Sequence, residues 1–102
     1  MMEPGYEMDV VIEQTLFGGA DLESASRAFS TEEEYAWEVL REMWERGWSF
    51  DVERNQDEGQ IEVEFKDRNR HSDWLHWANW PTMAGAVCIC ALRACGFEVD
   101  DE

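Results

Sequence analysis

The chain has 102 residues, of which 24 are Asp or Glu and 8 are Lys or Arg, so its formal net charge at pH 7 is -16. This length is typical of one domain, and a hydrophobic fraction of 44% with six Trp excludes a disordered acidic tail. The acidic balance argues against direct binding to nucleic acid or to an anionic membrane, because both would repel the chain. We therefore expect a single acidic domain over residues 1–102, with a basic protein surface as its natural partner.

The first predicted helix covers residues 6–17. Its apolar side chains, among them Val10 and Phe17, recur at helical spacing. Gly18-Gly19 then supplies a stop signal, so residues 20–29 are expected to form a connecting loop.

A second helix is predicted to begin near Ser30 and to end at Gly47. Ser30 with Glu33 has the spacing of a capping box, and Thr31 with Glu34 offers the same spacing one residue later. The acidic first turn also complements the helix dipole. The expected apolar stripe of this helix consists of Ala36, Val39, Leu40 and Met43.

From Trp48 the apolar period changes from 3.6 to 2. Two alternating segments, 48–53 and 61–66, are separated by Asn55-Gln56-Asp57-Glu58-Gly59. This pattern predicts a β-hairpin with one apolar face and one polar face. The apolar face is expected to hold Trp48, Phe50, Val52, Ile61, Val63 and Phe65.

Residues 72–80 fit two structures. Alternation of Trp74, His76 and Ala78 with their neighbours fits a strand packed on both faces, whereas the spacing of Trp74 and Trp77 alone fits a helical turn. A third strand is the preferred interpretation.

Thr82 is expected to cap a last helix, Met83 to Cys95, which Gly96 ends. This segment is apolar nearly all round, so it is predicted to be buried on more than one side. It is too short to cross a bilayer, and the N-terminal sequence has no secretory signal pattern, so a cytoplasmic protein is expected.

Three cysteines, Cys88, Cys90 and Cys95, fall in the last helix. Cys88 and Cys90 would point to nearly opposite sides, and Cys88 and Cys95 would lie about two turns, ~10 Å, apart. Neither pair has the geometry of a metal site or a disulfide. Buried thiols are therefore expected, with no metal and no cofactor.

Together these elements predict an α+β fold of order α-α-β-β-β-α, in a sandwich-like arrangement. The second and third helices would pack on the apolar face of a three-stranded antiparallel sheet, with the first helix beside them or on the other side. The strict alternation in the hairpin predicts that much of its polar face stays in water.

Three stretches resemble the small proteins called phage ABA sandwich domains. They are DVVIEQTLFG (9–18), FSTEEEYAWEVLREMWERGW (29–48) and TMAGAVCICALRACGFEV (82–99). The chain departs from the family pattern in two ways. Its loop between the first two helices is short, and its proline, Pro81, precedes the cap of the last helix, whereas the family often has a proline early in that helix. The resemblance implies a phage origin, the cytoplasm of a bacterial host and helices on both faces of the sheet, with no catalytic residues. A homodimer through the sheet edge or the aromatic segment would reconcile this layering with a wet polar face.

Two clusters of acidic residues stand out. Like charges at their spacings repel each other, on a helix face or across a hairpin. One interpretation is a solvated surface that keeps the protein soluble. The other is a phosphate-like array that occupies an Arg/Lys groove, with fast and salt-sensitive association. The candidate partner-binding residues are Glu34, Glu38, Glu42 and Glu45 on the second helix, and Asp51, Glu53, Glu62 and Glu64 on the hairpin.

The six tryptophans divide into two groups. The first group is expected to frame the core around the second helix. The members of the second group cannot all point to one side of a strand, so one or two of them are candidates for an exposed aromatic interface. Core or edge packing is the preferred interpretation. The groups are Trp37, Trp44 and Trp48, then Trp74, Trp77 and Trp80.

Three functional hypotheses follow. The preferred one is a phage-encoded inhibitor that binds the basic groove of a host nucleic-acid-handling defence protein, of CRISPR–Cas or restriction type, as a DNA mimic. The alternative is a non-enzymatic phage accessory or structural interaction module, with a homodimer as one candidate form, whose acidic surface only keeps it in solution. A third is a small-molecule binder, which needs a pocket. No glycine-rich phosphate loop, nucleophile elbow or paired metal-binding His is present, so no enzymatic activity is expected.

Overall fold

The computed structural model describes residues 4–18, 28–55, 59–68 and 75–96. Its elements, in chain order, are α1 (Tyr6–Leu16), α2 (Glu33–Glu45), β1 (Trp48–Asn55), β2 (Gln60–Asp67), β3 (Leu75–Trp80) and α3 (Met83–Ala94). The predicted α+β fold and its α-α-β-β-β-α order are confirmed. Within the segment 72–80, which fitted two structures, Leu75–Trp80 is a strand, and residues 72–74 lie outside the described part of the chain.

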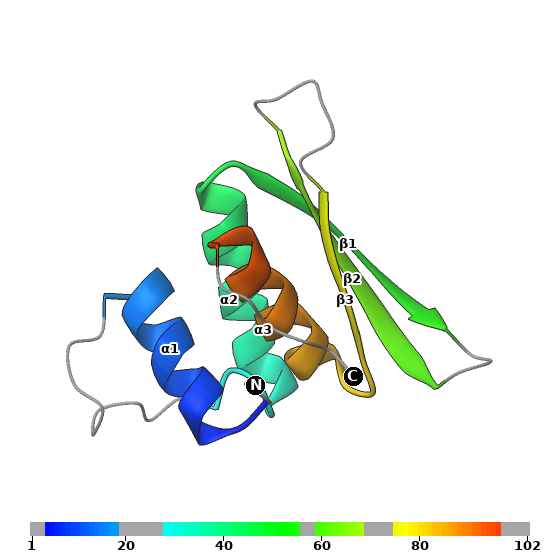
Figure 1. Ribbon diagram of the computed structural model, residues 1–102, viewed down its shortest axis with the longest axis horizontal. Coiled ribbons are helices and arrows are strands. Elements are labelled where there is room, and N and C mark those ends of the chain that lie inside the picture. The colour runs from blue at the N-terminus through cyan, green and yellow to red at the C-terminus, as the bar shows by residue number, and fades with distance from the viewer. Residues whose placement is uncertain (1–3, 19–27, 56–58, 69–74, 97–102) are drawn as a thin grey trace.

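The elements form three layers (Figure 1). The sheet is one outer layer, α2 and α3 form the middle layer, and α1 lies on the far side of the helices from the sheet. Within the middle layer, α2 contacts β1, whereas α3 contacts β2 and β3. The prediction for α2 and α3 is confirmed, and α1 packs beside them on α3. Among the described residues no helix covers the second face of the sheet, so the layering implied by the family resemblance is absent from this part of the chain.

The sheet is antiparallel with strand order β1-β2-β3. Phe50 lies opposite Phe65, and Val63 has Val52 on one side and Ala78 on the other. Because side chains alternate between the faces, these residues share the inner face that meets the helices. Val63, Phe65 and Ala78 are fully buried there, and Trp48, Phe50 and Ile61 are partly buried against the core. Most of the predicted apolar face of the hairpin therefore packs on the helices, whereas Val52 at its edge is 37% exposed.

Helix α3 is the centre of the core. Every residue from Ala84 to Leu92 is buried, because the helix lies between the sheet, α2 and α1. Thr82 caps it as predicted, its hydroxyl accepting a hydrogen bond from the Gly85 N–H at 3.2 Å. Gly85 also faces the ring of Trp80, and a Cβ at this position would meet Trp80 Nε1 at 2.8 Å and Cγ at 2.9 Å. The all-round apolar pattern therefore corresponds to burial on several sides.

Neither predicted capping box begins α2. The helix starts at Glu33, and the preceding Glu32 makes no side-chain capping bond. Ser30 instead turns to α1, where its backbone N–H and hydroxyl donate to Asp9 Oδ1 at 2.8 and 2.6 Å, and its Oγ accepts from the Gly5 N–H at 2.8 Å. Asp9 is 6% exposed, and a buried carboxylate requires such donors. The serine thus ties the start of α1 to the segment before α2.

Candidate partner-binding surfaces

Four carboxylates of the hairpin lie together on the outer face of the sheet. Asp51 lies directly opposite Glu64, and Glu53 lies directly opposite Glu62. All four residues occupy positions that alternate with the buried Val63 face. Within the described residues none of them belongs to an ion pair. We call these four residues the sheet cluster.

The geometry of the sheet cluster concentrates negative charge. Neighbouring strands lie about 4.8 Å apart and alternate residues of one strand about 6.7 Å apart, so the carboxyl groups stand at the corners of a small rectangle. Two directly opposed like-charge pairs destabilise the free protein. A cationic partner would relieve this repulsion. The register of β1 and β2 thus brings the four predicted residues together.

The second predicted cluster, Glu34, Glu38, Glu42 and Glu45, is partly neutralised. We call it the α2 row, and it lies on the side of α2 away from the buried stripe. Arg41 Nε lies 3.8 Å from Glu45 Oε1, and Arg46 Nε lies 2.8 Å from Glu42 Oε2. Two of the four carboxylates thus already have cationic partners.

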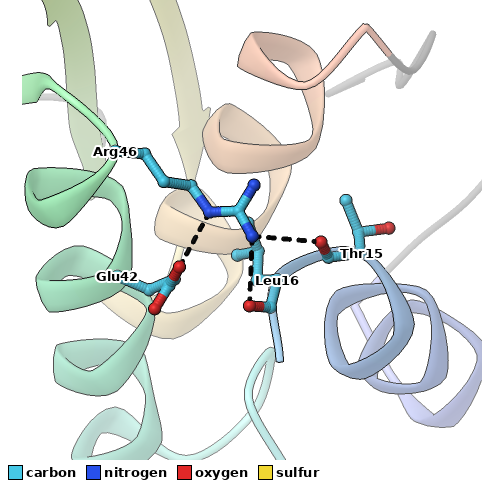
Figure 2. A network of polar contacts seen from close by, with 4 residues as sticks. All are labelled: Thr15, Leu16, Glu42 and Arg46. Atoms are coloured by element: carbon cyan, nitrogen blue, oxygen red, sulfur yellow. Dashed lines mark hydrogen bonds and ion pairs between the residues drawn. The ribbon is translucent and has the colours of Figure 1, made fainter. Parts of the chain in front are cut away.

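One of these pairs also has a structural role. Figure 2 shows Arg46 between Glu42 and the C-terminal end of α1. Its Nη2 atom donates to the carbonyl oxygens of Thr15 at 3.4 Å and Leu16 at 3.2 Å. Helix α1 has no basic residue in its own last turn, so Arg46 supplies the positive charge that a helix C-terminus favours. Glu42 orients that arginine and is less available to a partner.

The two clusters do not form one surface. Helix α2 packs against the inner face of the sheet, whereas the sheet cluster lies on the outer face, so the core separates them. A single groove on a partner would engage one cluster at a time. The sheet cluster, which has no ion pairs among the described residues, is the stronger candidate.

The expectation that Trp37 and Trp44 frame the core is wrong. Their side chains are 54% and 47% exposed, respectively. The two residues are seven positions apart and so share one side of α2, next to the buried stripe but outside it. Trp44 packs edge-on against Phe50, with ring centroids 6.4 Å apart, and the Arg68 guanidinium lies 4.0 Å from the centroid of its ring. The seven-residue spacing of Trp37 and Trp44 is the sequence signal that both lie on one side of the helix.

Trp48, Trp77 and Trp80 lie in three different environments. Trp48 is half-buried and meets His76 edge-on at 5.6 Å between ring centroids. Trp77 lies opposite Glu64 on the outer face and is 49% exposed, whereas Trp80 is half-buried on the inner face beside α3. Because Trp74 lies outside the described residues, Trp77 is the member of the predicted aromatic interface that adjoins the sheet cluster.

The cysteines are protected by the core. Cys88 and Cys90 are fully buried, as predicted, and Cys95 is half-buried. Burial raises the pKa of the Cys88 thiol well above its usual value, and the nearby Asp9 charge adds to this. Burial likewise raises the pKa of Cys90 to about 12. In the described parts of the chain no three His, Cys, Asp or Glu side chains gather closely enough to hold a metal ion.

The burial of the thiols predicts their reactivity and the pH dependence of stability. Cys88 and Cys90 are expected not to react with DTNB in the folded protein at pH 8, whereas Cys95 should react slowly, and all three should react in urea. Because their pKa values are raised in the folded state, the unfolded chain loses thiol protons near pH 9 while the folded chain keeps them. The free energy of unfolding should therefore decrease as pH rises above 9. Urea titrations at pH 8 and pH 10 with DTNB kinetics test this, and rapid reaction of two native thiols would contradict it.

A cleft of about 510 Å³ lies under the turn end of the hairpin. Its walls come from the inner face of β1 and β2 and from the starts of α2 and α3, with Glu33 and Arg54 as its charged residues and Val52, Ile61 and Met83 among the apolar ones. Among the described residues that line the cleft there is no His or Cys. Because Val52 and Arg54 of β1 line the cleft, it lies directly beside this strand.

Comparisons with known proteins bear on the fold. No family model matches the chain, and no curated protein matches it. The resemblance to phage ABA sandwich domains therefore has no matching family model behind it. Within the described residues, none of the helices has the length and apolar character needed to cross a membrane.

A solved structure with a similar fold is that of a phage protein from Bacillus cereus ATCC 14579. The TM-score is 0.73, and the match covers 98% of this chain and 94% of the other at 17% sequence identity. At this identity the likeness concerns architecture. The chain therefore has a fold that also occurs, over nearly its whole length, in a phage protein.

Proposed function

We propose that this chain is a non-enzymatic phage-encoded inhibitor that binds a basic groove on a host nucleic-acid-handling protein. The observation that carries the proposal is the sheet cluster. Its carboxylates stand in two directly opposed pairs, Asp51 with Glu64 and Glu53 with Glu62, and form no ion pairs within the described residues. Such an arrangement destabilises the free protein and favours a bound state in which cations lie between the carboxylates.

The physical basis of inhibition is competition for cations. A groove that holds phosphates is lined by Arg and Lys, and arginine forms bidentate bonds with carboxylates as it does with phosphates. The net charge of -16 would accelerate encounter with such a groove, and added salt would slow it. The bound protein would then exclude nucleic acid from the groove.

The fold supports a phage origin for the proposal. A phage protein shares the architecture over 94% of its own length. Phages face host proteins that bind and cut foreign nucleic acid, so CRISPR–Cas effectors and restriction enzymes are the partner classes that we propose. The site of action would be the cytoplasm of the bacterial host.

The test compares two variants of equal charge. One carries Asp51→Asn, Glu53→Gln, Glu62→Gln and Glu64→Gln, and the other carries Gln at Glu32, Glu34, Glu38 and Glu45. Each variant has a formal charge of -12, because four of the sixteen excess negative charges are removed. Glu42 is kept in the control because it orients Arg46.

Tagged wild-type protein and both variants are used to capture proteins from bacterial lysate. We expect the wild type and the control to retain a nucleic-acid-binding protein at low salt and to release it at high salt or on addition of DNA. The sheet-cluster variant should lose this protein. Equal retention by both variants, or recovery of phage structural proteins at either salt, would contradict the proposal and favour the structural module.

A further inference from the structure

The two free edges of the sheet differ in their protection. The strand order makes β1 and β3 the edge strands. On β3, which has six residues, Arg93 Nη1 donates to the Trp77 carbonyl at 2.7 Å and so covers the edge. On the eight-residue β1, no described residue makes a comparable bond from the edge side. Unprotected edges of this length are templates for another strand.

The register shows which backbone groups of β1 are available. The Arg68 N–H donates to the Gly47 carbonyl at 2.9 Å, and this pair extends the β1–β2 register by one residue. In an antiparallel ladder bonded residues alternate, so the N–H and C=O groups of Phe50, Val52 and Arg54 point to the free edge. The same alternation places the Trp77 carbonyl on the free edge of β3, where Arg93 meets it.

An exposed apolar wall lies beside this edge. Val52 is 37% exposed although it belongs to the inner face, and Trp44 packs against the neighbouring Phe50. Trp37 lies on the same side of α2, between Trp44 and Glu33, and Glu33 lines the cleft with Val52. Three of the five large exposed apolar side chains among the described residues thus gather here. We call Trp37, Trp44, Val52 and the free backbone of β1 the β1 edge surface.

The charges on the outer side of the edge select the occupant. If a second copy paired antiparallel through β1 about Val52, Asp51 of each copy would lie opposite Glu53 of the other. Two like-charge pairs would then destabilise the dimer. A strand with Lys or Arg on that side would instead place cations beside Asp51 and Glu53. Charge complementarity therefore favours a basic strand over a second copy.

We infer that β1 captures an extended segment of a partner protein as a fourth strand. Alternate Lys or Arg side chains of this segment lie over Asp51 and Glu53, and the intervening apolar side chains pack on Trp37, Trp44 and Val52. The backbone groups of Phe50, Val52 and Arg54 supply the ladder bonds. The inference uses the proposed function only for the sign of the partner's charge.

The probe is a synthetic eight-residue peptide in which Lys and Val alternate, matched in length to β1. Two control peptides accompany it: one has Glu in place of Lys, and the other has the same side chains with every backbone amide N-methylated. We expect the probe to bind and to slow amide exchange at Phe50, Val52 and Arg54 at least about tenfold. Neither control peptide should bind measurably.

Two variants of the chain separate the edge from the charge. Val52→Pro removes an N–H that faces the free edge, where proline is tolerated, and should weaken binding of the probe about tenfold, the worth of one to two hydrogen bonds. Val52→Thr keeps the N–H and a branched side chain and should bind within about twofold. Circular dichroism verifies that both variants fold. Glu62→Gln with Glu64→Gln, away from the edge, should change affinity less than Val52→Pro.

The outcomes are decisive in either direction. Binding of the N-methylated peptide as tightly as the probe, or unchanged exchange at the three amides of β1, would overturn the inference even if Val52→Pro failed to fold. A dimer of the free protein that protects the same amides would also overturn it. The assay contains no nucleic-acid-handling protein, so failure of the proposed function would leave its result intact.

Discussion

Replacing Asp9 with Ala is expected to lower the free energy of unfolding by about 3 kcal/mol, because a buried charged acceptor of two hydrogen bonds is lost. The donors are the backbone N–H and the hydroxyl of Ser30. Asp9 and Ser30 are both buried. The hydroxyl retains an alternative acceptor, the Gly5 carbonyl at 3.2 Å. The Ser30 N–H has no alternative among the hydrogen bonds of the described residues, so its desolvation is uncompensated in the variant.

Two further variants show whether this loss has the proposed cause. Glu7→Ala removes the same charge from the same first turn of α1, where the residue is exposed, and should change stability by less than about 0.5 kcal/mol. Ser30→Ala removes only the hydroxyl and should cost about 1 kcal/mol. Urea unfolding followed by tryptophan fluorescence measures all three. A loss below 1 kcal/mol for Asp9→Ala, or equal losses for Asp9→Ala and Glu7→Ala, would contradict the assignment.

Gly85→Ala is expected to destabilise the protein by about 2 kcal/mol, although the same change in an open helix stabilises by about 1 kcal/mol. The reason is the Trp80 ring, whose Nε1 and Cγ atoms would lie 2.8 and 2.9 Å from the new Cβ. The ring would have to move out of its site between the end of β3 and α3. The sign of the effect therefore reports on this contact.

A double-mutant cycle with Trp80→Leu tests the contact directly. The smaller side chain leaves space for a methyl group, so Gly85→Ala should cost less, or stabilise, in the Trp80→Leu background. Thermal unfolding of the four proteins provides the comparison. A stabilising effect of Gly85→Ala in the wild-type background, or strict additivity in the cycle, would show that the two residues do not limit each other.

Structure can be predicted best from the sequence where a short repeat of apolar and polar residues determines it. Two-residue alternation on both sides of one turn places Asp51, Glu53, Glu62 and Glu64 on one face, because a slip of one residue would bury the carboxylates. The sheet cluster could therefore be predicted, and the register confirms it. The buried character of α3 followed in the same way from its continuous apolar pattern.

The remaining features depend on contacts between distant segments. Ser30 has a cap-like spacing to Glu33, but Asp9, 21 residues away, offers a buried acceptor that outweighs the local bond. The exposure of Trp37 and Trp44 follows from where α2 sits on β1, which helical periodicity does not specify. Likewise, an amphipathic pattern indicates that α1 packs on something, but not that it packs on α3 beyond the sheet.

Helix α1 is held at its two ends by different means. Near its start, Asp9 is bonded to Ser30, and at its end the carbonyls of Thr15 and Leu16 accept from Arg46. Between these two sets of hydrogen bonds, which we call clasps, α1 contacts the rest of the protein mainly at α3. It belongs neither to the sheet nor to the middle layer of α2 and α3. It is therefore suited to detach as one cooperative unit while the sheet, α2 and α3 stay folded. Such partial opening would uncover the apolar back of α3, so the two clasps protect the chain from self-association before global unfolding begins.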